Sequence, residues 1–83
     1  MTREDIKALI LEIIHDIDDE ADFDNLQPDK PLRDQLDLDS MDFLDIVMEL
    51  RKRHQLQIPE SDYPRLATLN SCADYLEPLL QDV

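Results

Sequence analysis

The sequence predicts an all-α protein, a small up-down bundle of three main helices plus a short, irregular third helix. Apolar residues recur at spacings of three and four in three separate segments, the pattern of helices that bury one face. The chain has 83 residues, of which 42% are hydrophobic, enough to build one modest core. We therefore expect a single domain over residues 1–83.

Residues 3–17 are expected to form the first helix. Thr2 can cap its start, and Glu4 and Asp5 suit the positive end of the helix dipole. One broad apolar face at helical spacing comprises Ile6, Leu9, Ile10, Ile13, Ile14 and Ile17.

The helical periodicity fails over residues 18–38, which predicts a long ordered loop. Pro28, Pro31 and many Asp and Asn residues favour turns there. Five apolar side chains are expected to pin this loop to the bundle: Phe23, Leu26, Leu32, Leu36 and Leu38. A loop of this length in so small a domain tends to serve a function.

Residues 39–54 are expected to form the second helix, which carries two separate apolar faces. On a helical wheel, the core face contains Phe43, Ile46, Val47, Leu50 and His54. The second face, called here the apolar stripe, consists of Met41, Leu44 and Met48, and the acids Asp42, Asp45 and Glu49 border it. Exposed methionines suit the recognition of several partners because they adapt to different shapes. The alternative is that the long loop covers the stripe; we expect it to cover Met41 and Leu44 in part and Met48 less.

Two further helices complete the prediction. Residues 61–66 are expected to form a short irregular helix, whose length Pro64 limits. Thr68 can cap a last helix over residues 69–80, with Leu69, Cys72, Ala73, Leu76 and Leu80 on one face.

The composition argues against several classes of function. The net charge of −13, from 21 acidic and 8 basic residues, disfavours nucleic acid and anionic membranes and favours basic protein surfaces as partners. Glycine is absent, so phosphate-cradling loops and nucleophile elbows cannot form in their usual way. The single cysteine leaves no internal disulfide. No apolar run approaches the ~20 residues of a membrane span, and we expect a cytoplasmic monomer.

Ser40 opens the helix that bears the apolar stripe. A serine at this place is commonly just a helix cap, but Asp39 can supply the cap and free the Ser40 hydroxyl. The N-terminus of a helix favours a phosphate group, whereas the nearby acids would repel a free phosphate; they are Asp37, Asp39, Asp42 and Asp45. A covalently attached phosphate escapes that objection.

The segment Leu36-Asp37-Leu38-Asp39-Ser40-Met41-Asp42 resembles the phosphopantetheine attachment motif of acyl carrier proteins, commonly L-G-x-D-S-L-D. The resemblance extends over nearly the whole chain. The order of helices, the Ile58-Pro59-Glu60 step, the Ala67-Thr68-Leu69 entry and Asp74-Tyr75-Leu76 match this family in kind and spacing.

The resemblance implies that Ser40 carries a covalent 4′-phosphopantetheine arm, attached by a separate phosphopantetheinyl transferase. Asp39 and Met41 complete the motif, and Asp39 would help the transferase and its metal to engage. The chain would hold acyl groups as thioesters and perform no chemistry itself. Its partners would be enzymes of fatty-acid, lipid or polyketide-type synthesis with basic docking surfaces. They would dock on Met41 together with Asp42, Leu44, Asp45, Met48 and Glu49.

Two features depart from the family pattern. Asp37 stands where the family usually has glycine, so its backbone must avoid a conformation that only glycine adopts. Arg51, Lys52 and Arg53 replace a commonly acidic end of the recognition helix. They either complement the negative end of the helix dipole or select a dedicated partner with acids at that place.

Other sites are weaker candidates. His15 and His54 lack acid and nucleophile partners at a recognisable spacing, and Cys72 is expected to be an inert core residue. The acid run from Asp16 has Ala21 and Gln27 where a calcium-binding EF-hand loop needs glycine and glutamate.

Two other functions remain open from the sequence. An acidic helical inhibitor of a basic nuclease would have the same size, charge and helices. A carrier of aminoacyl or peptidyl groups would share both the fold and the serine.

Overall fold

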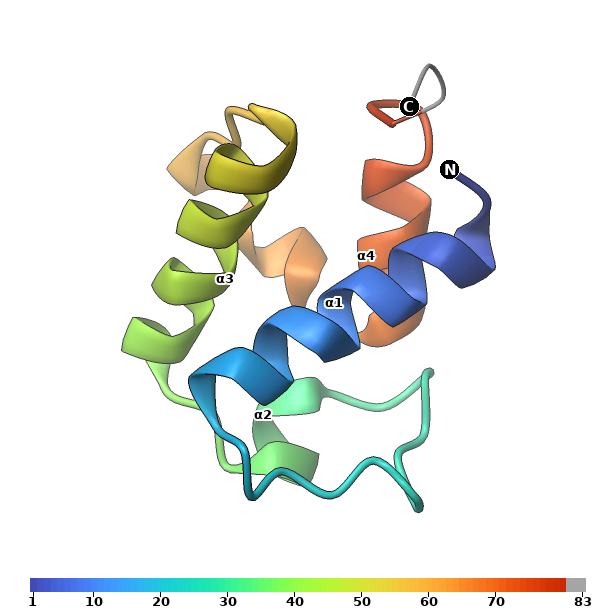
Figure 1. Ribbon diagram of the computed structural model, residues 1–83, viewed down its shortest axis with the longest axis vertical. Coiled ribbons are helices and arrows are strands. Elements are labelled where there is room, and N and C mark those ends of the chain that lie inside the picture. Colours follow the sequence, from blue (N-terminus) through green and yellow to red (C-terminus); the bar gives the residue numbers. More distant parts are fainter. Residues whose placement is uncertain (81–83) are drawn as a thin grey trace.

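The computed structural model describes residues 1–80. This part of the chain folds into five helices, which confirms the all-α class (Figure 1). They are α1 (Arg3–Ile17), α2 (Leu32–Leu36), α3 (Ser40–His54), the 3₁₀ helix η1 (Glu60–Leu66) and α4 (Leu69–Leu76). In Figure 1, α1 runs diagonally across α4 and ends near the start of the upright α3. That residues 1–83 form a single domain stays a prediction.

Helix α1 spans the expected residues because its start is capped and its apolar face is continuous. The Thr2 hydroxyl accepts a hydrogen bond from the Asp5 backbone N–H, and the Asp5 carboxylate accepts one from the Thr2 N–H, both at 3.2 Å. This reciprocal capping box satisfies two N–H groups that the helix leaves unpaired. All the predicted core residues of this helix are buried except Ile17, which is half-buried at its end.

The segment expected as a loop contains a short helix, so the prediction of an uninterrupted loop over residues 18–38 is wrong. Helix α2 follows Pro31, at a position where the missing proline N–H costs no helical hydrogen bond. Its residues Leu32 and Leu36 lie one turn apart and are both buried. This tertiary packing stabilises a helix too short to show a periodicity.

The remaining loop is ordered by the Gln35 side chain. Its amide oxygen accepts a hydrogen bond from the Gln27 N–H at 2.7 Å, and its amide nitrogen donates to the Gln27 and Lys30 carbonyls at 2.9 and 3.0 Å. The loop is also tied to the entrance of α4, where the Asn70 N–H donates to the Pro28 carbonyl at 2.9 Å. These bonds hold the glycine-free loop in one conformation and tie it to the start of α4.

The last helix ends at Leu76, four residues before the predicted end at residue 80. Pro78 explains the difference because it has no N–H to donate to the carbonyl one turn earlier. The chain continues as a turn in which Leu79 and Leu80 both donate to the Leu76 carbonyl at 3.0 Å. Leu80 still reaches the core and is fully buried.

Helix α3 starts at Ser40, one residue later than predicted, because Asp39 is its cap. It ends before Gln55, whose backbone conformation is unfavourable for a residue other than glycine. Gln55 follows α3 with φ 56° and ψ 32°, in the left-handed region that glycine adopts most easily. We expect Gln55→Gly to raise the free energy of unfolding by about 0.5–1 kcal/mol, measured by urea denaturation. Gln57→Gly is the matched control: Gln57 has no positive φ, so glycine there brings no gain. Equal effects of the two substitutions would contradict the prediction.

Candidate functional site

Asp39, not Ser40, caps the recognition helix. The Asp39 carboxylate accepts a hydrogen bond from the Asp42 N–H at 3.0 Å, and the Asp42 carboxylate accepts one from the Asp39 N–H at 3.1 Å. The Asp39 carbonyl also accepts the N–H of Phe43 at 3.2 Å. The capping function is thus complete without a serine hydroxyl.

The Ser40 hydroxyl is therefore available for chemistry. Ser40 is the first residue of α3 and is exposed, and its Oγ makes no hydrogen bond to any residue in the described range 1–80. A hydroxyl that serves neither a cap nor the core can be substituted without unfolding the helix. A phosphate on this oxygen would sit at the positive end of the helix dipole. Ser40 thus fits a covalent phosphoester.

The backbone before Ser40 keeps the turn that a glycine would make. Asp37 has φ 57° and ψ 38°, in the left-handed region. Aspartate tolerates this region better than most residues because its short side chain can hydrogen-bond locally. Asp37 therefore avoids a conformation that only glycine adopts, as expected, and still turns the chain from α2 into α3.

A cleft of about 480 Å³ opens beside Ser40. Helix α3 contributes Phe43 and Leu44 to its wall, and η1 contributes Tyr63 and Pro64. Sequence reasoning assigned no site role to these η1 residues, because their position opposite α3 depends on the path of the chain after α3. The Ile58-Pro59 step was the only local signal that the chain turns back there.

The apolar stripe is exposed on the surface, and Leu44 is less exposed than the two methionines. Met41 is 69% exposed, Leu44 40% and Met48 64%. The expectation of partial cover holds for Leu44 but is wrong for Met41, the most exposed of the three. Exposed apolar side chains grouped on one helix face are typical of interaction surfaces, which makes this stripe a candidate docking surface.

The acids beside the stripe differ in their availability. Asp45 is exposed and makes no ion pair within residues 1–80. Asp42 is half-buried in the capping box, and Glu49 accepts a hydrogen bond from Arg53 at 3.1 Å. Asp45 is thus the most accessible carboxylate of this group.

Cys72 is buried in the core, and burial raises the pKa of its thiol to about 12. Because the thiolate is the reactive form, we expect iodoacetamide at pH 8 to leave the native protein unlabelled and to label it fully in urea. Mass spectrometry measures the label. The folded-state pKa lies above the unfolded value of about 8.5, so this group's contribution to stability is present below pH ~8.5 and is lost as the pH rises towards 12. Rapid labelling of the native protein would contradict this prediction.

Residues 1–80 contain neither a membrane-spanning helix nor a cluster of metal ligands. No helix in this range has the length and hydropathy that crossing a membrane requires. No group of three or more His, Cys, Asp or Glu side chains in this range is arranged to hold a metal ion.

The protein is thus a small acidic helical bundle with an exposed serine at the start of α3. The chain matches the family described as phosphopantetheine attachment site over residues 4–76. It belongs to this family of carrier proteins, which bear a covalent 4′-phosphopantetheine group.

Similar proteins come from several bacteria. The acyl carrier protein of Chlorobium phaeobacteroides is 32% identical over 53 residues, 64% of this chain and 68% of the relative. That of Rubrobacter xylanophilus is 30% identical over 76 residues, 92% and 93% of the two chains. The meromycolate extension acyl carrier protein of Mycobacterium leprae is 28% identical over 82 residues, 99% of this chain and 70% of the relative. Within the family, the protein is thus an acyl carrier.

Proposed function

We propose that Ser40 is the residue that receives the 4′-phosphopantetheine arm. One observation carries this proposal. Asp39 caps α3, which leaves the Ser40 hydroxyl exposed and without a hydrogen bond within residues 1–80. Ser40 is one of three serines, with Ser61 and Ser71. The Ser71 hydroxyl is engaged at the start of α4, where it accepts from the Thr68 N–H at 3.0 Å.

In the attachment step, the Ser40 oxygen attacks the phosphorus that joins pantetheine to the nucleotide of coenzyme A. The new O–P bond forms as the bond to the nucleotide phosphate breaks, and the nucleotide bisphosphate leaves. The serine proton passes to a base on a separate phosphopantetheinyl transferase. Asp39 helps that transferase and its metal to engage the site. Once attached, the arm supplies a thiol that holds the acyl group as a thioester.

The chain itself holds and presents its cargo and catalyses no reaction. The cleft beside Ser40, with Phe43, Leu44, Tyr63 and Pro64 in its wall, shelters part of the acyl group from water. Its volume of about 480 Å³ is within the range of small-molecule sites. This places apolar surface next to the point of attachment, as an acyl cargo requires.

Partner enzymes dock on α3 through the apolar stripe and its acids. The apolar stripe, Met41, Leu44 and Met48, fills an apolar groove of the partner. The Lys and Arg residues on the rim of this groove face Asp45 first and the less accessible Asp42 and Glu49 second. The enzymes are those of fatty-acid, lipid or polyketide-type synthesis. A cytoplasmic location and a monomeric state stay predictions.

The test is to incubate the protein with coenzyme A and a broad-specificity phosphopantetheinyl transferase and to record the intact mass. We expect the mass to rise by one arm, and peptide mapping to find the arm on the peptide that contains Ser40. No gain in mass would favour the acidic nuclease inhibitor instead. An arm on Ser61 or Ser71 would overturn the assignment of the residue but not of the family. Loading with acyl against aminoacyl groups then separates the two kinds of carrier.

A further inference from the structure

The three basic residues at the end of α3 have different roles. Arg53 ties α3 to α1, because its guanidinium pairs with Asp16 and its Nη1 lies 3.6 Å from Glu12 Oε1. Within α3 it also donates to Glu49. Arg51 and Lys52 are exposed and make no ion pair or side-chain hydrogen bond within residues 1–80. The fold thus uses one of the three cations and leaves the other two available to a partner.

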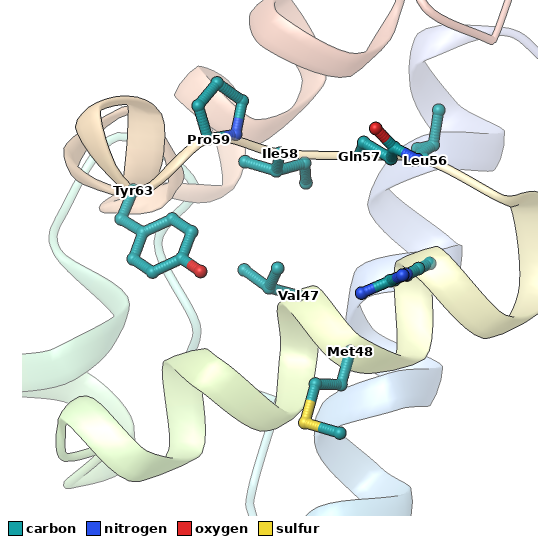
Figure 2. Close-up of a pocket in the computed structure, with 8 residues that line it drawn as sticks. Val47, Met48, Leu56, Gln57, Ile58, Pro59 and Tyr63 are labelled. Carbon is teal, nitrogen blue, oxygen red and sulfur yellow. The ribbon is translucent and has the colours of Figure 1, made fainter.

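Arg51 lines a cleft of about 510 Å³ at the far end of the apolar stripe from Ser40. Figure 2 shows the cleft between α3, which contributes Val47, and the chain segment that contains Ile58 and leads to Tyr63. Met48, one turn before Arg51, is also part of the lining. Of the described residues that line this cleft, Arg51 alone carries a formal charge. An entering carboxylate meets a cation and apolar walls, with no acid among the lining residues.

We propose that this cleft receives the carboxylate of an Asp or Glu from the docking surface of a partner enzyme, and that Arg51 pairs with it. The partner then has a mixed rim, basic opposite Asp45 and acidic opposite Arg51. This inference rests on the proposed function, because it describes the partner of the same docking helix.

The negative charge of the whole protein does not remove the preference of this cleft for a carboxylate. The net charge of −13 attracts basic surfaces from a distance. At physiological salt, however, exposed charges are screened over about 8 Å, so groups outside the cleft act weakly within it. The nearby acids Asp16, Asp45 and Glu49 line a separate cleft that Arg51 also borders. A partner with a uniformly basic rim would bring a cation against Arg51, which disfavours that complex. The end of α3 therefore discriminates between partners that the acidic part of the helix alone would accept.

The test uses an acyl-transferring enzyme of known structure, whose docking groove is rimmed only by Lys and Arg, as the probe. A second probe is the same enzyme with Glu in place of the rim residue that faces the end of α3. Each probe enzyme loads an acyl group onto the arm-bearing protein, and kcat/KM is measured. The quantity compared is kcat/KM with the Glu-rim probe divided by kcat/KM with the parent probe. We expect this ratio to be about tenfold higher for the wild type than for Arg51→Glu. Arg51→Gln, which leaves no charge, falls between them.

Lys30→Glu is the matched control, since it makes the same change of charge at an exposed loop residue. It should keep the ratio of the wild type, and circular dichroism should show helical content unchanged in every variant. Equal ratios for the wild type and Arg51→Glu would overturn the proposal, while the gain of the arm by both would leave the proposed function intact. A wild-type dimer in sedimentation that Arg51→Glu dissociates would also overturn it, by assigning the cleft to a second copy of this chain.

Discussion

Ser40→Ala is expected to abolish attachment of the phosphopantetheine arm while leaving the protein folded. The intact mass after incubation with coenzyme A and transferase should stay at that of the unmodified chain. No other residue can replace the lost nucleophile at the head of α3, because Asp39 is a carboxylate held in the capping box and Met41 has no hydroxyl. The expected loss is complete rather than a reduction in rate.

The same variant separates a chemical role of the hydroxyl from a structural one. Ser40 is exposed, and its hydroxyl makes no hydrogen bond within the described residues, so alanine leaves no buried polar group unpaired. Alanine also has the higher helix propensity, and the free energy of unfolding should change by less than ~0.5 kcal/mol. Ser61→Ala, at an exposed serine of η1, is the matched control and should gain the arm normally. Modification of Ser40→Ala, or its unfolding, would sink the assignment.

The parts of the fold that the sequence predicted well are those determined by local chemistry. The cap at Thr2 and the unbroken apolar periodicity define α1 within a single segment. Helix α2 was missed because its stability depends on distant contacts: the Leu32 N–H donates to the Ala67 carbonyl at 2.8 Å, far along the chain. The early end of α4 could be predicted from the sequence, because Pro78 is a local signal for the end of a helix. The prediction gave more weight to the apolar spacing, which continues to Leu80.

The candidate site shows the same division between local and long-range information. The helical wheel separates Met41 and Met48 from the core face, and the structure leaves both exposed. The wheel cannot show which charged groups are already paired, since Arg53 reaches across to Asp16 of α1 as well as to Glu49. Three consecutive basic residues therefore look equivalent in the sequence and differ in the structure.

Met48→Glu is expected to leave the fold intact and to slow acyl transfer by partner enzymes. Met48 is 64% exposed, so a carboxylate there is not buried. The new Glu lies one turn before Lys52, and such a pair stabilises a helix by about 0.2–0.5 kcal/mol. Burying a methionine side chain in a partner groove contributes about 1.5–3 kcal/mol. Its loss predicts a fall in kcat/KM of roughly 10- to 100-fold.

The salt dependence of the effect identifies its cause. At low salt, attraction between the new carboxylate and a basic partner rim offsets part of the lost apolar contact, and added salt screens this attraction. The fall in kcat/KM relative to the wild type should therefore deepen as the salt concentration rises. Met48→Leu, which keeps an apolar side chain of similar size, should stay within about threefold of the wild type. Loss of the helical circular dichroism signal in Met48→Glu would instead place Met48 in the core, and unchanged transfer at high salt would remove it from the docking surface.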